Sequence, residues 1–121
     1  MEKKAMIIRM NGVNEQDVNT EYYYSLVEEL QIIKRIQQGG KERDTAIEKL
    51  TQSWLRIVAA VAKKYANNNL SMDELIKAGC EGLVVAAEKF DERRGFKFIC
   101  YAIWGIRQSI EREIENQNKQ E

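Results

Sequence analysis

The sequence predicts an all-α protein, a compact helical bundle of about four helices. Three observations predict this fold class. The chain of 121 residues contains no proline, its apolar residues recur at three- and four-residue steps, and clusters of Gly or Asn separate the periodic stretches. A chain of this length is typical of one domain with a single core. We therefore expect each periodic stretch to form a helix that contributes one apolar side to that core.

The first predicted helix covers about residues 20–38 and ends at the glycine pair 39–40. Its apolar residues fall on one side of the helix: Leu26, Val27, Leu30, Ile33 and Ile36. The residues before it contain an Asn-Gly turn signal at 11–12 and then a mostly polar stretch. We interpret residues 1–20 as an N-terminal arm whose structure the pattern leaves open, and residues 21–121 as the helical domain.

The second and third predicted helices have clearer signals. Residues 43–65 carry apolar side chains at helical spacing: Ile47, Leu50, Trp54, Ile57, Val58, Val61, Ala62 and Tyr65. Ser71 followed by Glu74 is a capping-box pattern that opens the third helix, which reaches about residue 90. Its buried side is predicted to contain Leu75, Ile76, Gly79, Leu83, Ala87 and Phe90. Gly79 and Gly82 would let another backbone approach this helix closely.

A turn at residues 91–95, with Gly95 suited to a left-handed conformation, leads into the last helix at about 97–117. Isoleucines form one side of it, which we expect to anchor the helix to the bundle: Ile99, Ile103, Ile106, Ile110 and Ile114. The opposite side receives a different set: Tyr101, Trp104, Gly105, Gln108 and Arg112. The pattern therefore predicts two large aromatic residues away from the core.

Composition excludes several classes of function. The chain has no histidine, and its two cysteines, Cys80 and Cys100, are expected to be reduced thiols, so no metal or other cofactor is predicted. The absence of a nucleotide-binding loop or an evident carboxylate pair argues against an enzyme. The apolar runs are too short for a bilayer and no signal peptide is recognisable, so we expect a cytoplasmic protein with no membrane partner. Because the net charge is zero, binding to nucleic acid requires a local basic surface.

Such a surface is predicted around the start of the last helix. Five aromatic residues lie close together in the sequence: Phe90, Phe96, Phe98, Tyr101 and Trp104. Four basic residues are interleaved with them or follow closely: Arg93, Arg94, Lys97 and Arg107. Cations neutralise phosphates and release counterions, and each base can stack on an aromatic ring for about 1–3 kcal/mol. The segment is therefore typical of a surface that binds single-stranded nucleic acid.

Each part of this surface also has a purely structural interpretation. The three phenylalanines are equally well explained as core residues that pack under the turn. The basic residues of the turn are also what an ordinary solvated turn contains. Tyr101 and Trp104 fit a core role less well, because the isoleucines already define the buried side of the helix.

The segment RGFKFICYAIWGIRQSI at residues 94–110 resembles the strand-opening segment of primary-class sigma subunits of bacterial RNA polymerase. LRIVAAVAKKY at 55–65, LSMDELIKAGCEGLVVAAEKFD at 70–91 and, more loosely, ELQIIKRIQQG at 29–39 resemble the preceding conserved blocks in the same order. The resemblance covers roughly residues 26–117 and implies the helical region-two domain of that family. It implies a module without an active site, which binds a coiled coil of the largest polymerase subunit and captures the non-template strand of the minus-ten promoter element.

The resemblance also implies roles for individual residues. Pocket, wedge or strand-contact positions of the family match Phe90, Asp91, Arg94, Phe96, Phe98, Tyr101 and Trp104. Lys97 matches a contact to the DNA backbone, and Gln108 matches a reader of the duplex edge. The charge pattern adds Arg93, Arg107 and Arg112 to the expected DNA-binding residues. Polymerase contacts are expected on the third helix, at Asp73, Glu74, Lys77, Ala78 and Cys80.

Several positions depart from the family pattern. Gly105 stands where a second tryptophan of a wedge pair is usual, and Glu111 replaces a threonine that contacts DNA. The family usually has Asp, Gln, Glu and Asn at four polymerase-contact positions, which here are Glu74, Lys77, Ala78 and Cys80. Only Glu74 keeps the chemical type of the usual residue. The third helix is consistent with retained polymerase binding, with a solvated face that has lost its partner, or with a variant partner surface.

We therefore predict a sigma-factor-like transcription initiation module that binds the polymerase core and single-stranded minus-ten DNA. The alternative is a sigma-like interaction or regulatory module without DNA-melting activity, which Gly105, Glu111 and the altered third helix favour. An anti-sigma regulator is a further candidate partner. The helix-turn-helix that reads the minus-thirty-five element in this family does not follow residue 121, which is expected either of a fragment or of a short natural relative.

Overall fold

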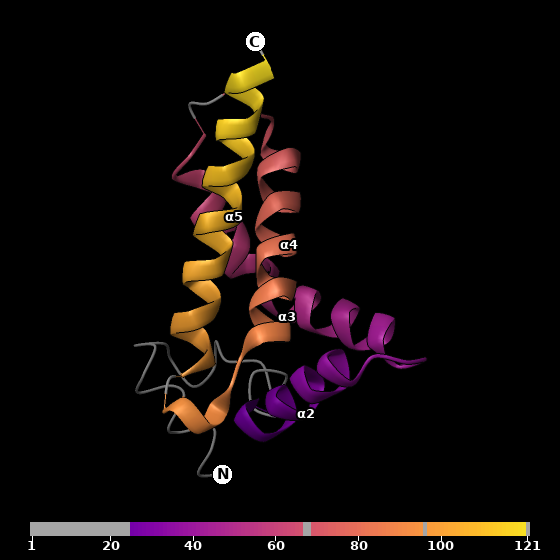
Figure 1. Cartoon of the computed structure of the whole chain (residues 1–121). Helices are drawn as coiled ribbons and strands as arrows, with labels where there is room; N and C mark the ends of the chain where they lie inside the picture. Colours follow the sequence, from indigo (N-terminus) through magenta and orange to yellow (C-terminus); the bar gives the residue numbers. More distant parts are fainter. Residues whose placement is uncertain (1–24, 67–68, 96, 121) are drawn as a thin grey trace, which may run out of the picture.

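The computed structural model describes residues 25–66, 69–95 and 97–120. In these residues the elements are α2 (Ser25–Gln38), α3 (Arg43–Lys63), α4 (Met72–Lys89), the short 3-10 helix η3 (Glu92–Arg94) and α5 (Phe98–Gln120). α4 and α5 lie side by side, α3 packs against both, and α2 contacts α3 and α4 (Figure 1). The predicted all-α bundle is therefore confirmed, while the proposed arm at residues 1–20, the predicted start of the first helix and Phe96 lie outside the described residues.

The helix ends follow the local signals in the sequence. The Ser71 hydroxyl accepts a hydrogen bond from the Glu74 backbone N–H at 3.2 Å, and the Glu74 carboxylate accepts one from the Ser71 N–H at 3.0 Å. This is the predicted capping box, which provides partners for N–H groups that have none inside the helix. α2 ends at Gln38, directly before the glycine pair. Gly95 has a φ of 84°, the left-handed conformation expected at the turn before α5.

One apolar core joins the four helices. Its largest fully buried side chains come from all of them: Ile33, Ile36, Leu50, Val58, Leu75, Leu83, Ile106 and Ile110. Burying each such side chain stabilises the fold by about 1.5–3 kcal/mol relative to leaving it exposed. Arg43 adds a polar link, because its guanidinium donates to the Ile36 carbonyl at 2.7 Å and pairs with Glu88 of α4. The end of α2, the start of α3 and α4 are thereby held together.

The crossing of α4 and α5 depends on small residues, and it corrects part of the prediction for the last helix. A Cβ atom on Gly105 would lie 3.0 Å from the Gly82 carbonyl oxygen and 3.1 Å from the Ala86 Cβ, so the two backbones are nearly in contact. Gly105 was predicted on the side opposite the core and in fact faces α4. The buried side of α5 also differs from the predicted isoleucine side. Ile99 is 43% exposed, whereas Ala102 is fully buried.

Three observations bear on membrane insertion, metal binding and thiol chemistry. Within the described ranges, no helix is long and apolar enough to cross a membrane. In those same ranges, His, Cys, Asp and Glu side chains form no group of three that could hold a metal ion. Cys80 is a half-buried free thiol, and its pKa is raised by burial first and then by the charge of Glu81. A raised pKa disfavours the thiolate, which is the reactive form.

Candidate nucleic-acid interface

A continuous series of aromatic contacts connects the core to the surface of α5. Trp54 meets Phe98 edge-on with ring centroids 5.6 Å apart, and Phe98 meets Phe90 in the same way at 5.2 Å. Phe90 then contacts Tyr101 at 6.1 Å, and Tyr101 stacks on Trp104 at 6.0 Å with an angle of 24° between the rings. Each ring is therefore supported by the one before it, and the series ends at the surface.

Trp104 is the exposed end of this series. It is 55% exposed, whereas Tyr101 beneath it is half-buried and packs against the core. A large exposed indole that is not part of the core costs hydrophobic free energy, which a stacked base would recover. The prediction that these two rings lie away from the buried side of α5 is confirmed for Trp104 and holds in part for Tyr101.

Phe90 and Phe98 occupy the core rather than the surface. Phe98 is 6% exposed and Phe90 is 9% exposed. Phe98 packs edge to face with both Trp54 and Phe90, so both phenylalanine rings are part of the buried aromatic packing. Burial disfavours direct stacking of a base on Phe98, and its role in DNA binding stays a prediction. Phe90 supports Tyr101, and Phe98 packs against Phe90 in turn.

The turn before α5 is organised by Asp91. Its carboxylate accepts hydrogen bonds from the Arg93 backbone N–H at 3.0 Å, from Nε of the same residue at 3.0 Å and from a terminal guanidinium nitrogen at 3.1 Å. These bonds from Arg93 lower the pKa of Asp91 and raise that of the Arg93 guanidinium. Arg93 remains 87% exposed at its side chain, so its charge is partly offset by Asp91 but still faces solvent.

The other basic and polar residues of the predicted site lie on one continuous stretch of chain. Arg94 ends η3 and Lys97 precedes the first residue of α5, and both are exposed. Arg107, Gln108 and Arg112 are exposed on the following turns of α5. The structure thus places these side chains on the surface of the turn and of α5.

A contact that the sequence pattern did not reveal connects the end of α3 with α5. The Tyr65 hydroxyl donates a hydrogen bond to the Glu111 carboxylate at 2.7 Å. Hydrogen bonding to Tyr65 and, less strongly, the charge of Glu111 raise the pKa of Arg107. The spacing placed Tyr65 in a core stripe and gave no signal for the position of its hydroxyl. Arg107 therefore shares its surroundings with a carboxylate that a hydrogen bond holds in place.

The predicted polymerase-binding residues on α4 differ in their exposure. Asp73, Glu74 and Lys77 are exposed, and Cys80 is half-buried. Ala78 is 2% exposed and belongs to the core, which disfavours a direct polymerase contact at this position. Glu74 is engaged in the capping box, and its hydrogen bonds with Ser71 lower its pKa.

The fold and this site define the class of protein: an all-helical module that displays stacked aromatic rings beside basic side chains. The family model described as Sigma-70 region 2 matches residues 50–120, which is more than half of the chain. The chain therefore belongs to the sigma-70 family and contains its region 2.

Full-length relatives agree with the family match. The chain is 46% identical over 86 residues to RNA polymerase sigma factor SigA1 of Synechococcus elongatus, covering 71% of this chain and 21% of that protein. It is 51% identical over 85 residues to SigA of Nostoc sp., covering 70% and 21%. It is 44% identical over 92 residues to RpoS of Coxiella burnetii, covering 76% and 25%. The chain spans about a fifth to a quarter of the length of these curated relatives.

Proposed function

We propose that this chain is a transcription initiation module that binds the RNA polymerase core and captures the non-template strand of the minus-ten promoter element. The observation that carries the proposal is the exposed Trp104 ring, which stacks on Tyr101 and lies on the same helix as the exposed Arg107 and Arg112. Bases of any sequence can stack on such a platform, and cations beside it attract the phosphates. Membership of the sigma-70 family makes promoter DNA the expected ligand.

The side chains then take different roles in DNA binding. Trp104 offers its outer face to a base, and Tyr101 supports it from the other side. Arg94 and Lys97, where the chain enters α5, neutralise the backbone of the captured strand. Gln108 lies one helical turn beyond Trp104, where its amide can reach the edge of the adjoining duplex.

Polymerase binding is proposed for the exposed side of α4. Asp73 and Lys77 are one turn apart on this helix and both side chains are exposed. A charge of each sign on one exposed face suits a helical partner with the opposite arrangement of charges. The coiled coil of the largest polymerase subunit is the partner that the family resemblance implies.

Strand capture is tested by fluorescence anisotropy with labelled minus-ten non-template oligonucleotides. We expect the full chain to prefer this strand to a scrambled one, and Trp104→Ala to weaken the interaction. Val85→Ala is the matched control, because Val85 is also an exposed apolar residue, on α4 instead of α5. Equal affinity for the scrambled strand, or no binding even at low salt, would contradict promoter capture.

Polymerase binding is tested separately with the isolated polymerase coiled coil. Asp73→Lys and Lys77→Glu reverse one charge each without touching the Ser71–Glu74 capping box. We expect each reversal to weaken co-purification, and a reversal of Glu115 near the far end of α5 to have no effect. Co-purification that is unchanged by both reversals on α4 would place the partner elsewhere.

The second candidate function is a sigma-like interaction module that does not open DNA. The contact of Tyr65 with Glu111 favours it, because a fixed carboxylate beside Arg107 repels phosphates. The position of Gly105 at the α4 crossing also favours it, because no second wedge side chain stands next to Trp104. Polymerase binding without binding to the minus-ten strand would select this alternative.

A further inference from the structure

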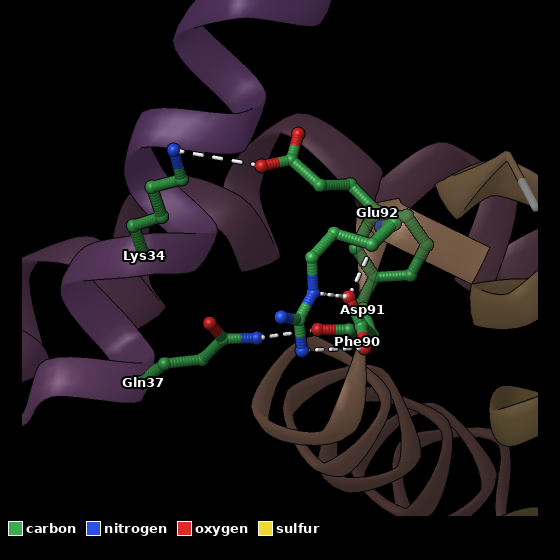
Figure 2. Close-up of polar contacts among 6 residues, drawn as sticks. Lys34, Gln37, Phe90, Asp91 and Glu92 are labelled. Atoms are coloured by element: carbon green, nitrogen blue, oxygen red, sulfur yellow. Dashed lines mark hydrogen bonds and ion pairs between the residues drawn. The ribbon is translucent and has the colours of Figure 1, made fainter. Parts of the chain in front are cut away.

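The last turn of α2 forms a cap on the end of α4 (Figure 2). The side-chain amide of Gln37 donates hydrogen bonds to the Phe90 carbonyl at 2.7 Å and to the Ala87 carbonyl at 3.0 Å. The last carbonyl groups of an α-helix have no partner inside the helix. Gln37 supplies a hydrogen-bond partner for two such carbonyls, from 50 and 53 positions earlier in the chain.

Phe90 is the point at which the chain leaves α4 and turns toward the aromatic site. Its backbone is extended, with φ −65° and ψ 133°. Its ring contacts Phe98 at 5.2 Å and Tyr101 at 6.1 Å, and Tyr101 stacks on Trp104. The residue whose carbonyl Gln37 holds is thus the one whose ring supports the exposed stack.

Apolar and polar contacts together hold α2 against the turn, since Ile33 and Phe90 belong to one buried core and Leu30 packs against it. A cleft of about 470 Å³ lies between them, lined by α2 residues that include Leu30 and Gln37 and by the turn residues Phe90 to Arg93. A second polar contact crosses it, between the Lys34 ammonium and the Glu92 carboxylate at 3.5 Å. Both of these side chains are largely exposed, and exposed ion pairs contribute little. The amide of Gln37, although this residue is exposed, makes two part-buried hydrogen bonds and so links α2 directionally to the start of the turn.

We propose that Gln37 is a positioning residue for strand capture, which acts by fixing the Phe90 backbone and through it the Tyr101–Trp104 stack. This inference rests on the proposed function in DNA binding. Loss of the amide leaves both carbonyls to water and lets the turn shift, so that the stack is less often in the binding arrangement. A hydrogen bond of this kind corresponds to a loss of affinity of about 3- to 10-fold.

The test compares Gln37→Met with Gln38→Met in the full chain. Methionine keeps the length of the side chain and removes the amide donor. Gln38 is the matched control, because it carries the same side chain on the same turn but does not line the cleft. We expect Gln37→Met to weaken binding to the minus-ten strand about 3- to 10-fold, with unchanged circular dichroism, and Gln38→Met to bind like the wild type.

A double-mutant cycle with Tyr101→Ala distinguishes positioning from a general structural role. If Gln37 acts through the stack, Gln37→Met has little further effect once Tyr101 is removed. Equal losses in both backgrounds, binding of Gln37→Met equal to that of the wild type, or loss of helical structure in that variant would each overturn the proposal.

Fluorine NMR of 5-fluorotryptophan-labelled protein separates this proposal from the proposed function. The resonance of Trp104 is assigned with Trp104→Phe and measured without DNA. We expect it to shift or broaden in Gln37→Met and to stay in place in Gln38→Met. If no variant binds DNA but this resonance changes as expected, the function in strand capture is wrong and the positioning of the stack by Gln37 stands. An unchanged resonance overturns the positioning role.

Discussion

Trp104 lies on Tyr101 in a nearly parallel stack, with the ring centroids 6.0 Å apart and the planes inclined by 24°. The two residues are three positions apart on α5, a spacing that brings side chains onto the same side of a helix. One face of the indole is thus occupied by a half-buried ring, while 55% of the residue remains exposed. The stack presents a supported platform to a ligand.

The first prediction concerns the supporting ring. Tyr101→Ala removes the ring beneath Trp104, and we expect the affinity for minus-ten single strands to fall about 5- to 150-fold, the range that corresponds to loss of one base–aromatic stack. Tyr101→Phe keeps the ring and should bind nearly as well as the wild type. Anisotropy titrations of both variants check this. A large loss with Tyr101→Phe would indicate that the hydroxyl, and not the ring, carries the contribution.

The second prediction concerns the carboxylate beside Arg107. Glu111→Gln keeps an oxygen that can accept the Tyr65 hydrogen bond and removes the negative charge. We expect tighter binding to promoter DNA, and a slope of log K against log salt that is steeper by about 0.7–0.9, since one more phosphate contact becomes effective. Glu115→Gln is the control, because Glu115 pairs with Lys119 further along the helix. The same change in both variants would indicate a general effect of net charge.

The third prediction concerns Glu29, which accepts a hydrogen bond from the Trp54 indole at 2.9 Å. Burial raises the pKa of this carboxyl, and the bond from Trp54 only partly opposes the shift. A folded-state pKa above the unfolded one means that folding favours the protonated form. Its contribution to stability is present below the ordinary value of 4.5 and is lost as the pH rises through the folded-state pKa.

Glu29→Gln should therefore increase the free energy of unfolding at neutral pH. The advantage over the wild type should shrink as the pH falls through the folded-state pKa and should be gone below the ordinary value of 4.5. Urea unfolding across this range measures both effects, with exposed Glu28→Gln as the control on the same helix. An advantage for Glu29→Gln that does not depend on pH would show that burial of the charge is not its cause.

Local signals in the sequence predicted the helix ends well, and tertiary contacts account for what they missed. The Ser71–Glu74 capping box and the turn at Gly95 depend on residues that are close together in the chain. The bonds from Gln37 to the end of α4 join residues that are fifty or more positions apart. No periodic or capping pattern encodes such a contact, so Gln37 could not be selected from the sequence alone.

The orientation of α5 was missed for a different reason. The sequence-based prediction takes the side with the large isoleucines as the buried one, and this side includes Ile99. The structure instead brings α4 against the smallest side chains of α5, with Ala102 buried and Gly105 at the crossing. Close helix approach is favoured where side chains are small, so the deepest contact need not follow the largest apolar residues. The exposure of Trp104 was still predicted correctly, because this residue lies neither on the predicted isoleucine side nor on the observed side against α4.

The last prediction concerns Gly105, the position at which the family usually has a second tryptophan. A Cβ atom here would already lie 3.0 Å from the Gly82 carbonyl oxygen and 3.1 Å from the Ala86 Cβ. Gly105→Trp should therefore push α4 and α5 apart, instead of placing a second ring beside Trp104, and lower the free energy of unfolding by about 1–3 kcal/mol. Gln108→Trp adds the same side chain at an exposed position of the same helix and should unfold nearly like the wild type. Urea denaturation and binding to the minus-ten strand are measured together. Tighter DNA binding by Gly105→Trp at unchanged stability would contradict this prediction. It would mean that the helix crossing accommodates the larger side chain and that the added ring extends the aromatic surface.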